Sequence, residues 1–197
     1  MGPIEYLWFA ITLIFAIVGV IRGFLKELGV TVVLIATLFG IDRLIPLLEQ
    51  LIRDGKLQAI GLKPFTGNPQ VDQPGHLILM LIFQAIVIVA VFVSYQGETL
   101  AYEGSAPKFP VGALLGLMVG AVNGYLITGT LWWILNHYQY PVSASIIDPN
   151  LLTPLAHTII NNGLLPLDLL GAGVQTVDSF GLLPFILVIL VVLKVVR

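Results

Sequence analysis

The sequence predicts an all-α integral membrane protein: a bundle of four or five transmembrane helices, with a short interfacial helix between the fourth and the fifth. Hydrophobic residues fill 57% of the 197 positions and charged residues only 10%, whereas a soluble domain carries about 25% charged residues. The mean hydropathy of the chain is +0.98. Lipid must therefore cover much of the surface, and we expect residues 1–197 to form one membrane domain.

The charge balance and the lack of cysteine exclude several classes of function. Nine Lys and Arg against eleven Asp and Glu give a net charge of −2, which does not suit a nucleic-acid partner. A chain without cysteine has no disulfide, no thiolate metal site and no cysteine nucleophile. The first apolar run is not preceded by the basic region of a signal peptide, so we expect it to stay in the mature protein.

The first two spans are expected over residues 4–25 and 28–48, because about 20 apolar residues in a helix cross the hydrocarbon. Residues 6–21 carry no charge, and the guanidinium of Arg22 can extend to the head groups. In the second span the uncharged part ends before Asp42 and Arg43.

Residues 77–95 and 111–135 form the third and fourth expected spans. Gln84 is the one strongly polar interior residue of the third, and the fourth ends in aromatic residues of the kind that mark membrane interfaces. A fifth apolar segment, 180–196, is interrupted only by Lys194. Although its uncharged part is short, we expect this segment to cross the bilayer with Lys194 reaching the head groups.

Proline and glycine mark the connections, and residues 49–76 and 96–110 are predicted to be exposed loops. Residues 136–179 are apolar but broken by prolines. Within them, Asp148-Pro149 is typical of a helix start and Asn161-Asn162-Gly163 of a helix stop, which predicts an interfacial helix over 148–162. Because this segment lacks Lys and Arg, we place it outside and the turn at Arg22 in the cytoplasm.

Two glycine patterns predict close helix packing. The first is a stripe spaced four residues apart along the fourth span: Gly112, Gly116, Gly120 and Gly124. Such residues share one helix face, which another backbone can approach closely. Gly19 and Gly23 give the first span a matching pair. These faces can serve packing inside the bundle, an interface with another membrane protein or a second copy, or a pore lining.

Few strongly polar side chains interrupt the apolar segments. Gln84 and Asn123 are the main ones, and we expect each to form an interhelical hydrogen bond. The uncharged cores of the spans contain no ionisable residue, which argues against a proton-coupled transporter or a charge-selective channel.

The residues that could support chemistry do not form a recognisable site. The histidines, His76, His137 and His157, share one predicted membrane face but lack the i, i+4 spacing of a helical metal site. We therefore expect no metal and no cofactor. The serines are scattered, and no G-x-S-x-G turn is present. No catalytic residue is assigned, and no enzyme activity is predicted.

The first turn carries a distinct motif, Arg22-Gly23-Phe24 followed by Lys26-Glu27. Gly23 permits a tight reversal, and Glu27 can pair with Arg22 or Lys26. The two cations can bind lipid phosphates or set the topology, and we favour the second role.

This turn between two apolar helices resembles the colicin V production family, small multi-pass proteins of the bacterial inner membrane. The stripe from Gly112 to Gly120 resembles the family's second signature, and the resemblance covers most of the first 160 residues. Where that family tends to carry Arg-Gly after the stripe, this chain has Asn123-Gly124.

The resemblance implies a role in toxin production or export and in envelope maintenance. We expect a non-enzymatic protein of the inner membrane that works by helix association. Its expected partners are membrane lipid and, through the glycine-lined faces, other membrane proteins or itself. Two alternatives stay open: an accessory transmembrane subunit of a respiratory or photosynthetic complex, and an oligomeric pore or transporter.

Overall fold

The structure, a computed structural model, describes residues 4–67, 69–96, 108–141, 152–171 and 181–195. Four long helices dominate it: α1 (Ile4–Arg22), α2 (Phe24–Arg53), α3 (Pro69–Gln96) and α4 (Val111–His137). Three shorter helices follow: α5 (Pro154–Asn161), α6 (Pro166–Leu170) and α7 (Leu183–Val195). The described residues contain no β-strand, which confirms the all-α fold.

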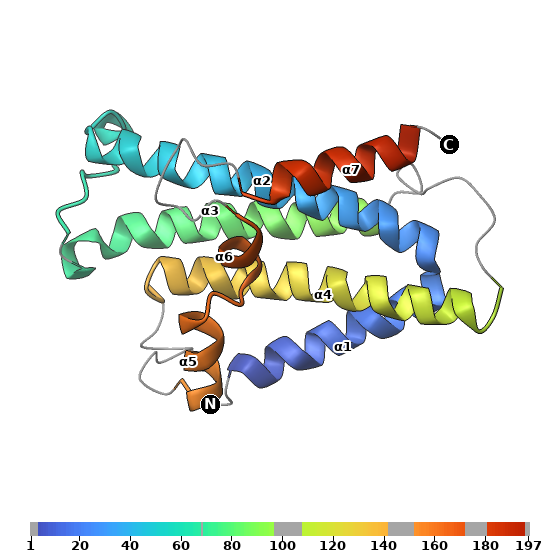
Figure 1. The fold of residues 1–197 in the computed structure, drawn as a ribbon. Helices are drawn as coiled ribbons and strands as arrows, with labels where there is room; N and C mark the ends of the chain where they lie inside the picture. Colours follow the sequence, from blue (N-terminus) through green and yellow to red (C-terminus); the bar gives the residue numbers. More distant parts are fainter. Residues whose placement is uncertain (1–3, 68, 97–107, 142–151, 172–180, 196–197) are drawn as a thin grey trace.

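The four long helices run up and down alongside one another (Figure 1). Each is long and apolar enough to cross a bilayer. The turn from α1 to α2, the end of α3 and the start of α4 lie at one end of the bundle, which we call the Arg22 end. The end of α2, the start of α3 and the end of α4 lie at the other, the Glu49 end. The multi-pass membrane architecture is thus confirmed.

The core lies where α2 and α3 pack on α4. It is formed by large apolar side chains that are at most 2% exposed, among them Leu34, Leu38, Ile41, Ile45, Phe83, Val87, Leu126 and Ile134. The opposite faces of α1 and α3 present exposed apolar side chains such as Leu13 and Val89. A bundle with this outward surface is suited to hydrocarbon and not to water.

The contact between α1 and α4 is made by backbone against backbone. A Cβ atom added at Gly19 would lie 2.8 Å from Gly120 Cα, and one added at Gly124 would lie 2.8 Å from Thr12 Cα. Gly116 likewise faces Gly19. These glycines therefore allow α1 and α4 of the same chain to pack closely. Gly23 does not take part in this contact, because a Cβ atom there would meet nothing within 4 Å.

The reversal between α1 and α2 depends on Gly23, whose φ of 88° lies in the region that favours glycine. This agrees with the tight turn predicted from the sequence. The Arg22 N–H groups and the Glu27 carboxyl are thereby held at adjoining helix ends.

The predicted loop over residues 49–76 is wrong at both ends, because α2 continues to Arg53 and α3 begins at Pro69. Two tertiary features explain the longer helices. Ile52 is fully buried, so the last turn of α2 belongs to the core. In the first turn of α3, the Asp72 carboxylate accepts hydrogen bonds from the backbone N–H groups of Thr66 and Gly67, which lie just before the helix. These contacts order a segment rich in turn residues.

The helix predicted over 148–162 is observed as α5, which is shorter. Its predicted start at Asp148-Pro149 lies outside the described residues. Instead, the Thr153 hydroxyl accepts the Ala156 N–H and caps the helix. The helix ends at the predicted stop, where Gly163 has a φ of 62°.

The C-terminal helices lie against the bundle: α6 packs on α4, and α7 on α2 (Figure 1). Pro166 of α6 occupies the space beside Gly129. At 13 residues, α7 is about 20 Å long, which is less than the roughly 30 Å of hydrocarbon. Crossing of the bilayer by 180–196 stays a prediction.

Candidate functional site

A buried polar network lies at the Arg22 end, where the α1–α2 turn, α3 and α4 meet. Its central group is the Glu27 carboxylate, and its other members are Arg22, Thr31, Tyr95 and Asn123. Glu27 and Asn123 are both 0% exposed. An ionised group removed from solvent in this way needs opposite charge and hydrogen bonds around it.

Three donors from three helices satisfy the Glu27 carboxylate. Arg22 Nη1 donates to Oε1 at 3.0 Å, while Tyr95 Oη and Asn123 Nδ2 donate to Oε2 at 3.0 and 2.9 Å. The ion pair with Arg22 is the pairing predicted for this turn. The carboxylate thus joins the end of α1, the end of α3 and the middle of α4 to the first turn of α2.

Asn123 extends the network along α2. Its Nδ2 also donates to the Glu27 backbone carbonyl at 3.0 Å, and its Oδ1 accepts from Thr31 Oγ1 at 2.7 Å. The amide therefore has partners for both its nitrogen and its oxygen, which confirms the predicted interhelical hydrogen bond. In a membrane-facing bundle, such bonds fix the register of one helix against another.

Arg22 connects the network to the bundle surface. Its side chain is 21% exposed, its guanidinium carbon lies 4.4 Å from the centroid of the Tyr95 ring, and Nη2 donates to the Tyr95 carbonyl at 3.4 Å. This cation–π contact and the ion pair hold the guanidinium in one place. Because the carboxylate oxygens accept from donors on three helices, the network is suited to holding these helices together.

The other predicted residues lie around this network or away from it. Lys26 is exposed at the same turn, and Gly19, Gly116, Gly120 and Gly124 form the α1–α4 contact described above. The hydrogen bond expected of Gln84 is not formed with any described residue. Its side chain is half-buried and lines an apolar groove of about 250 Å³ between α1, α3 and α4.

Tyr95 and Thr31 were not predicted to belong to a site. Tyr95 stands at the end of the third span, where aromatic residues are common for interfacial reasons alone. Thr31 lies one helical turn after Glu27 within an apolar run. The only sequence signal for Thr31 was that i, i+4 spacing, which places both residues on one face of α2.

The histidines do not form a metal centre. His76 and His137 line a second polar region at the Glu49 end, while His157 is exposed on α5. In the part of the chain that the structure describes, no group of three or more His, Asp or Glu side chains is placed to hold a metal ion.

Comparison with known proteins gives one match. The profile of the colicin V production protein family matches residues 4–161, which include all four long helices and the whole polar network. Neither a curated protein nor a solved structure matches the chain. Because the matched region is most of the chain, this multi-pass membrane protein belongs to the colicin V production protein family.

Proposed function

We propose that this protein is a non-enzymatic component of the bacterial inner membrane that supports colicin V production or export, and maintenance of the envelope, by associating with other membrane proteins. The observation that carries the proposal is the Glu27 network, which lies inside the family-matched region. Its hydrogen bonds join α1, α3 and α4 to α2.

The α1–α4 contact supports a role in association indirectly. Because Gly19, Gly116 and Gly120 face one another within the chain, the glycine faces hold α1 on α4. The opposite face of α1 is then turned outward with its large side chains exposed, among them Leu13 (61%) and Ile17 (50%). We place the contact with partner proteins, or with a second copy, on this outward face of α1 and on the corresponding face of α3.

Site-specific photocrosslinking in living cells tests the proposal. A photoreactive amino acid is placed at Leu13 of α1 or Val89 of α3, which are 61% and 59% exposed, and at the fully buried Leu34 as a matched control. We expect protein adducts from the two exposed positions and none from Leu34. Adducts with lipid alone would contradict association, and a stoichiometric respiratory or photosynthetic complex would replace the proposed role with that of an accessory subunit.

Activity is tested in a colicin V-producing strain that lacks its own family member. Expression of this chain should restore secreted colicin V, and Glu27→Ala should reduce it because the helices are no longer joined at the Arg22 end. Membrane levels of the variant, measured in parallel, separate loss of function from loss of protein. Failure of the wild-type chain to restore secretion would count against the role in export.

A further inference from the structure

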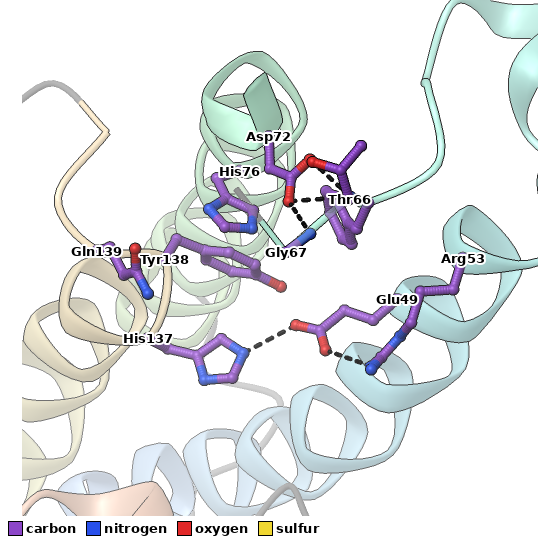
Figure 2. Close-up of a pocket in the computed structure, with 10 residues that line it drawn as sticks. Glu49, Arg53, Thr66, Gly67, Asp72, His76, His137, Tyr138 and Gln139 are labelled. Carbon is purple, nitrogen blue, oxygen red and sulfur yellow. Dashed lines mark hydrogen bonds and ion pairs between the residues drawn. The ribbon is translucent and has the colours of Figure 1, made fainter. Parts of the chain in front are cut away.

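A second polar region opens at the Glu49 end, as a cavity of about 460 Å³ between the end of α2, the start of α3 and the end of α4 (Figure 2). Its volume lies within the roughly 300–1,000 Å³ typical of small-molecule sites. The lining includes two carboxylates, one guanidinium, two imidazoles and a phenol: Glu49, Asp72, Arg53, His76, His137 and Tyr138. None of these groups belongs to the Glu27 network.

The length of the helices places this cavity at the level of the lipid head groups. The 30 residues of α2 measure about 45 Å, and the hydrocarbon is about 30 Å thick. Glu49 and Arg53 lie in the last turns of α2, and Asp72 and His76 in the first turns of α3. A charged cavity at this depth is accessible to head groups and to soluble molecules.

The two carboxylates differ in what they can still accept. Asp72 is saturated, since its two oxygens take part in four hydrogen bonds: the Thr66 N–H lies 2.9 Å from Oδ1 and 3.1 Å from Oδ2, the Thr66 hydroxyl donates to Oδ1 at 3.0 Å and the Gly67 N–H to Oδ2 at 2.8 Å. Glu49 receives only two partners, His137 Nε2 at 2.8 Å and Arg53 Nη2 at 3.2 Å. A carboxylate offers about four acceptor positions, so Glu49 can bind a further donor.

The hydroxyl of Tyr138 is a second group of the cavity that can bind a ligand. Tyr138 is 2% exposed, and its buried hydroxyl makes no hydrogen bond to any described residue. Figure 2 shows this hydroxyl pointing into the space between Glu49 and the Thr66–Asp72 contact. Burial, the negative charge of Glu49 and a long polar contact with the Glu49 carboxylate raise the pKa of Tyr138, so the phenol keeps its proton. A buried hydroxyl of this kind costs stability unless a partner reaches it.

The remaining donors and charges define the ligand. Two carboxylates, Glu49 and Asp72, outnumber the one guanidinium of Arg53 in the lining, which disfavours a simple anion. Arg53 is 61% exposed and uses one of its N–H groups on Glu49, leaving others for an anionic group at the mouth. The rings of Phe65, His76 and Tyr138 flank the interior, and aromatic faces attract ammonium ions.

We propose that this cavity binds a phosphoethanolamine group, with the ammonium on Glu49 and beside the Tyr138 hydroxyl, and the phosphate on Arg53. Glu49 and Arg53 form an ion pair, with Arg53 Nη2 3.2 Å from Glu49 Oε2, so the cavity presents a negative and a positive group side by side, which suits a short zwitterion whose ammonium and phosphate are joined by two carbons and an ester oxygen. The group is the head of phosphatidylethanolamine, and soluble phosphoethanolamine has the same chemistry.

Binding of defined probes to the purified full chain tests this site. In nanodiscs of equimolar phosphatidylethanolamine and phosphatidylglycerol, native mass spectrometry should show preferential retention of phosphatidylethanolamine. Tyr138→Phe, Glu49→Gln and Arg53→Gln should each lower this retention by about tenfold, since hydrogen bonds to charged groups are lost. Tyr6→Phe and Lys56→Gln are matched controls, because both residues are exposed and lie outside the cavity lining.

Titration with O-phosphoethanolamine identifies the source of the ligand. Displacement of the retained lipid would support the site and show that the soluble compound suffices, whereas retention of the lipid without displacement would support the lipid as the ligand. Equal retention of both lipids would overturn the proposal. So would binding of inorganic phosphate that Glu49→Gln strengthens, since that result describes an anion site. Tyr138→Phe removes no hydrogen bond of normal length from the described structure, and circular dichroism of the variant separates a loss of binding from misfolding.

Discussion

The Asn123 side-chain nitrogen lies 2.9 Å from the Glu27 carboxylate and 3.0 Å from the Glu27 carbonyl, so one amide on α4 binds both the side chain and the backbone of one residue on α2. Both residues are 0% exposed. This double contact fixes the height and rotation of α4 against α2 in a bundle whose other contacts are largely apolar.

Replacing Asn123 with Leu should lower the free energy of unfolding by about 2 kcal/mol, because Glu27 and the Thr31 hydroxyl each lose a buried partner. Unfolding by denaturing detergent, followed by circular dichroism, measures the change. Asn162→Leu is a suitable comparison, since Asn162 is exposed at the end of α5. Equal stabilities of the two variants would show that the amide contributes nothing.

The Arg22–Glu27 pair should show strong coupling in a double-mutant cycle. Arg22→Gln leaves the buried Glu27 charge without its cation, and Glu27→Gln leaves the guanidinium without its anion. We expect each single variant to lose about 3 kcal/mol and the double variant to lose less than the sum. Additive losses would mean that the two charges act independently.

Gly120→Leu should destabilise the chain by about 3 kcal/mol, because a Cβ atom there would lie 2.9 Å from Gly19 Cα and the backbones would have to separate. Gly40→Leu is the matched control: Gly40 is also within a long helix, yet a Cβ there meets nothing within 4 Å. Thermal unfolding of both variants in the same detergent is the measurement. A similar midpoint for both would contradict the close α1–α4 contact.

The Asp168 carboxyl should make the packing of α6 sensitive to pH. Burial raises the pKa of Asp168, although Trp133 Nε1 donates to it at 2.6 Å. A raised pKa in the folded state means that the neutral form is favoured there, so this contribution to stability is complete below about pH 4 and is lost as pH rises through the folded-state pKa.

Asp168→Asn should remove that part of the pH dependence, because the amide does not ionise. Thermal unfolding of the wild type and the variant between pH 4 and pH 7 is the comparison. The stability difference between the two proteins should change with pH in favour of the variant as pH rises. A difference that stays constant would show that Asp168 titrates alike in the folded and unfolded chains.

The sequence predicted the long helices well because membrane spans depend on local composition. The turn at Gly23 and the pairing of Arg22 with Glu27 followed from a five-residue spacing. By contrast, Tyr95 and Glu27 are separated by 68 residues in the sequence. The helical spacing of residues within one segment does not predict contacts between segments so far apart. The ends of α2 and α3 were misjudged for a related reason: proline and glycine predict turns locally, but burial of Ile52 and the Asp72 contacts depend on the assembled bundle.

The polar network also has an order of assembly. Arg22 lies five residues before Glu27, whereas Tyr95 and Asn123 follow it by 68 and 96 residues. During synthesis the first helical hairpin therefore enters the membrane with Glu27 supported by Arg22 alone, and the amide and phenol donors arrive only when the third and fourth helices have been inserted. Insertion of the last long helix thus completes the hydrogen bonding of a carboxylate that the ribosome delivered first.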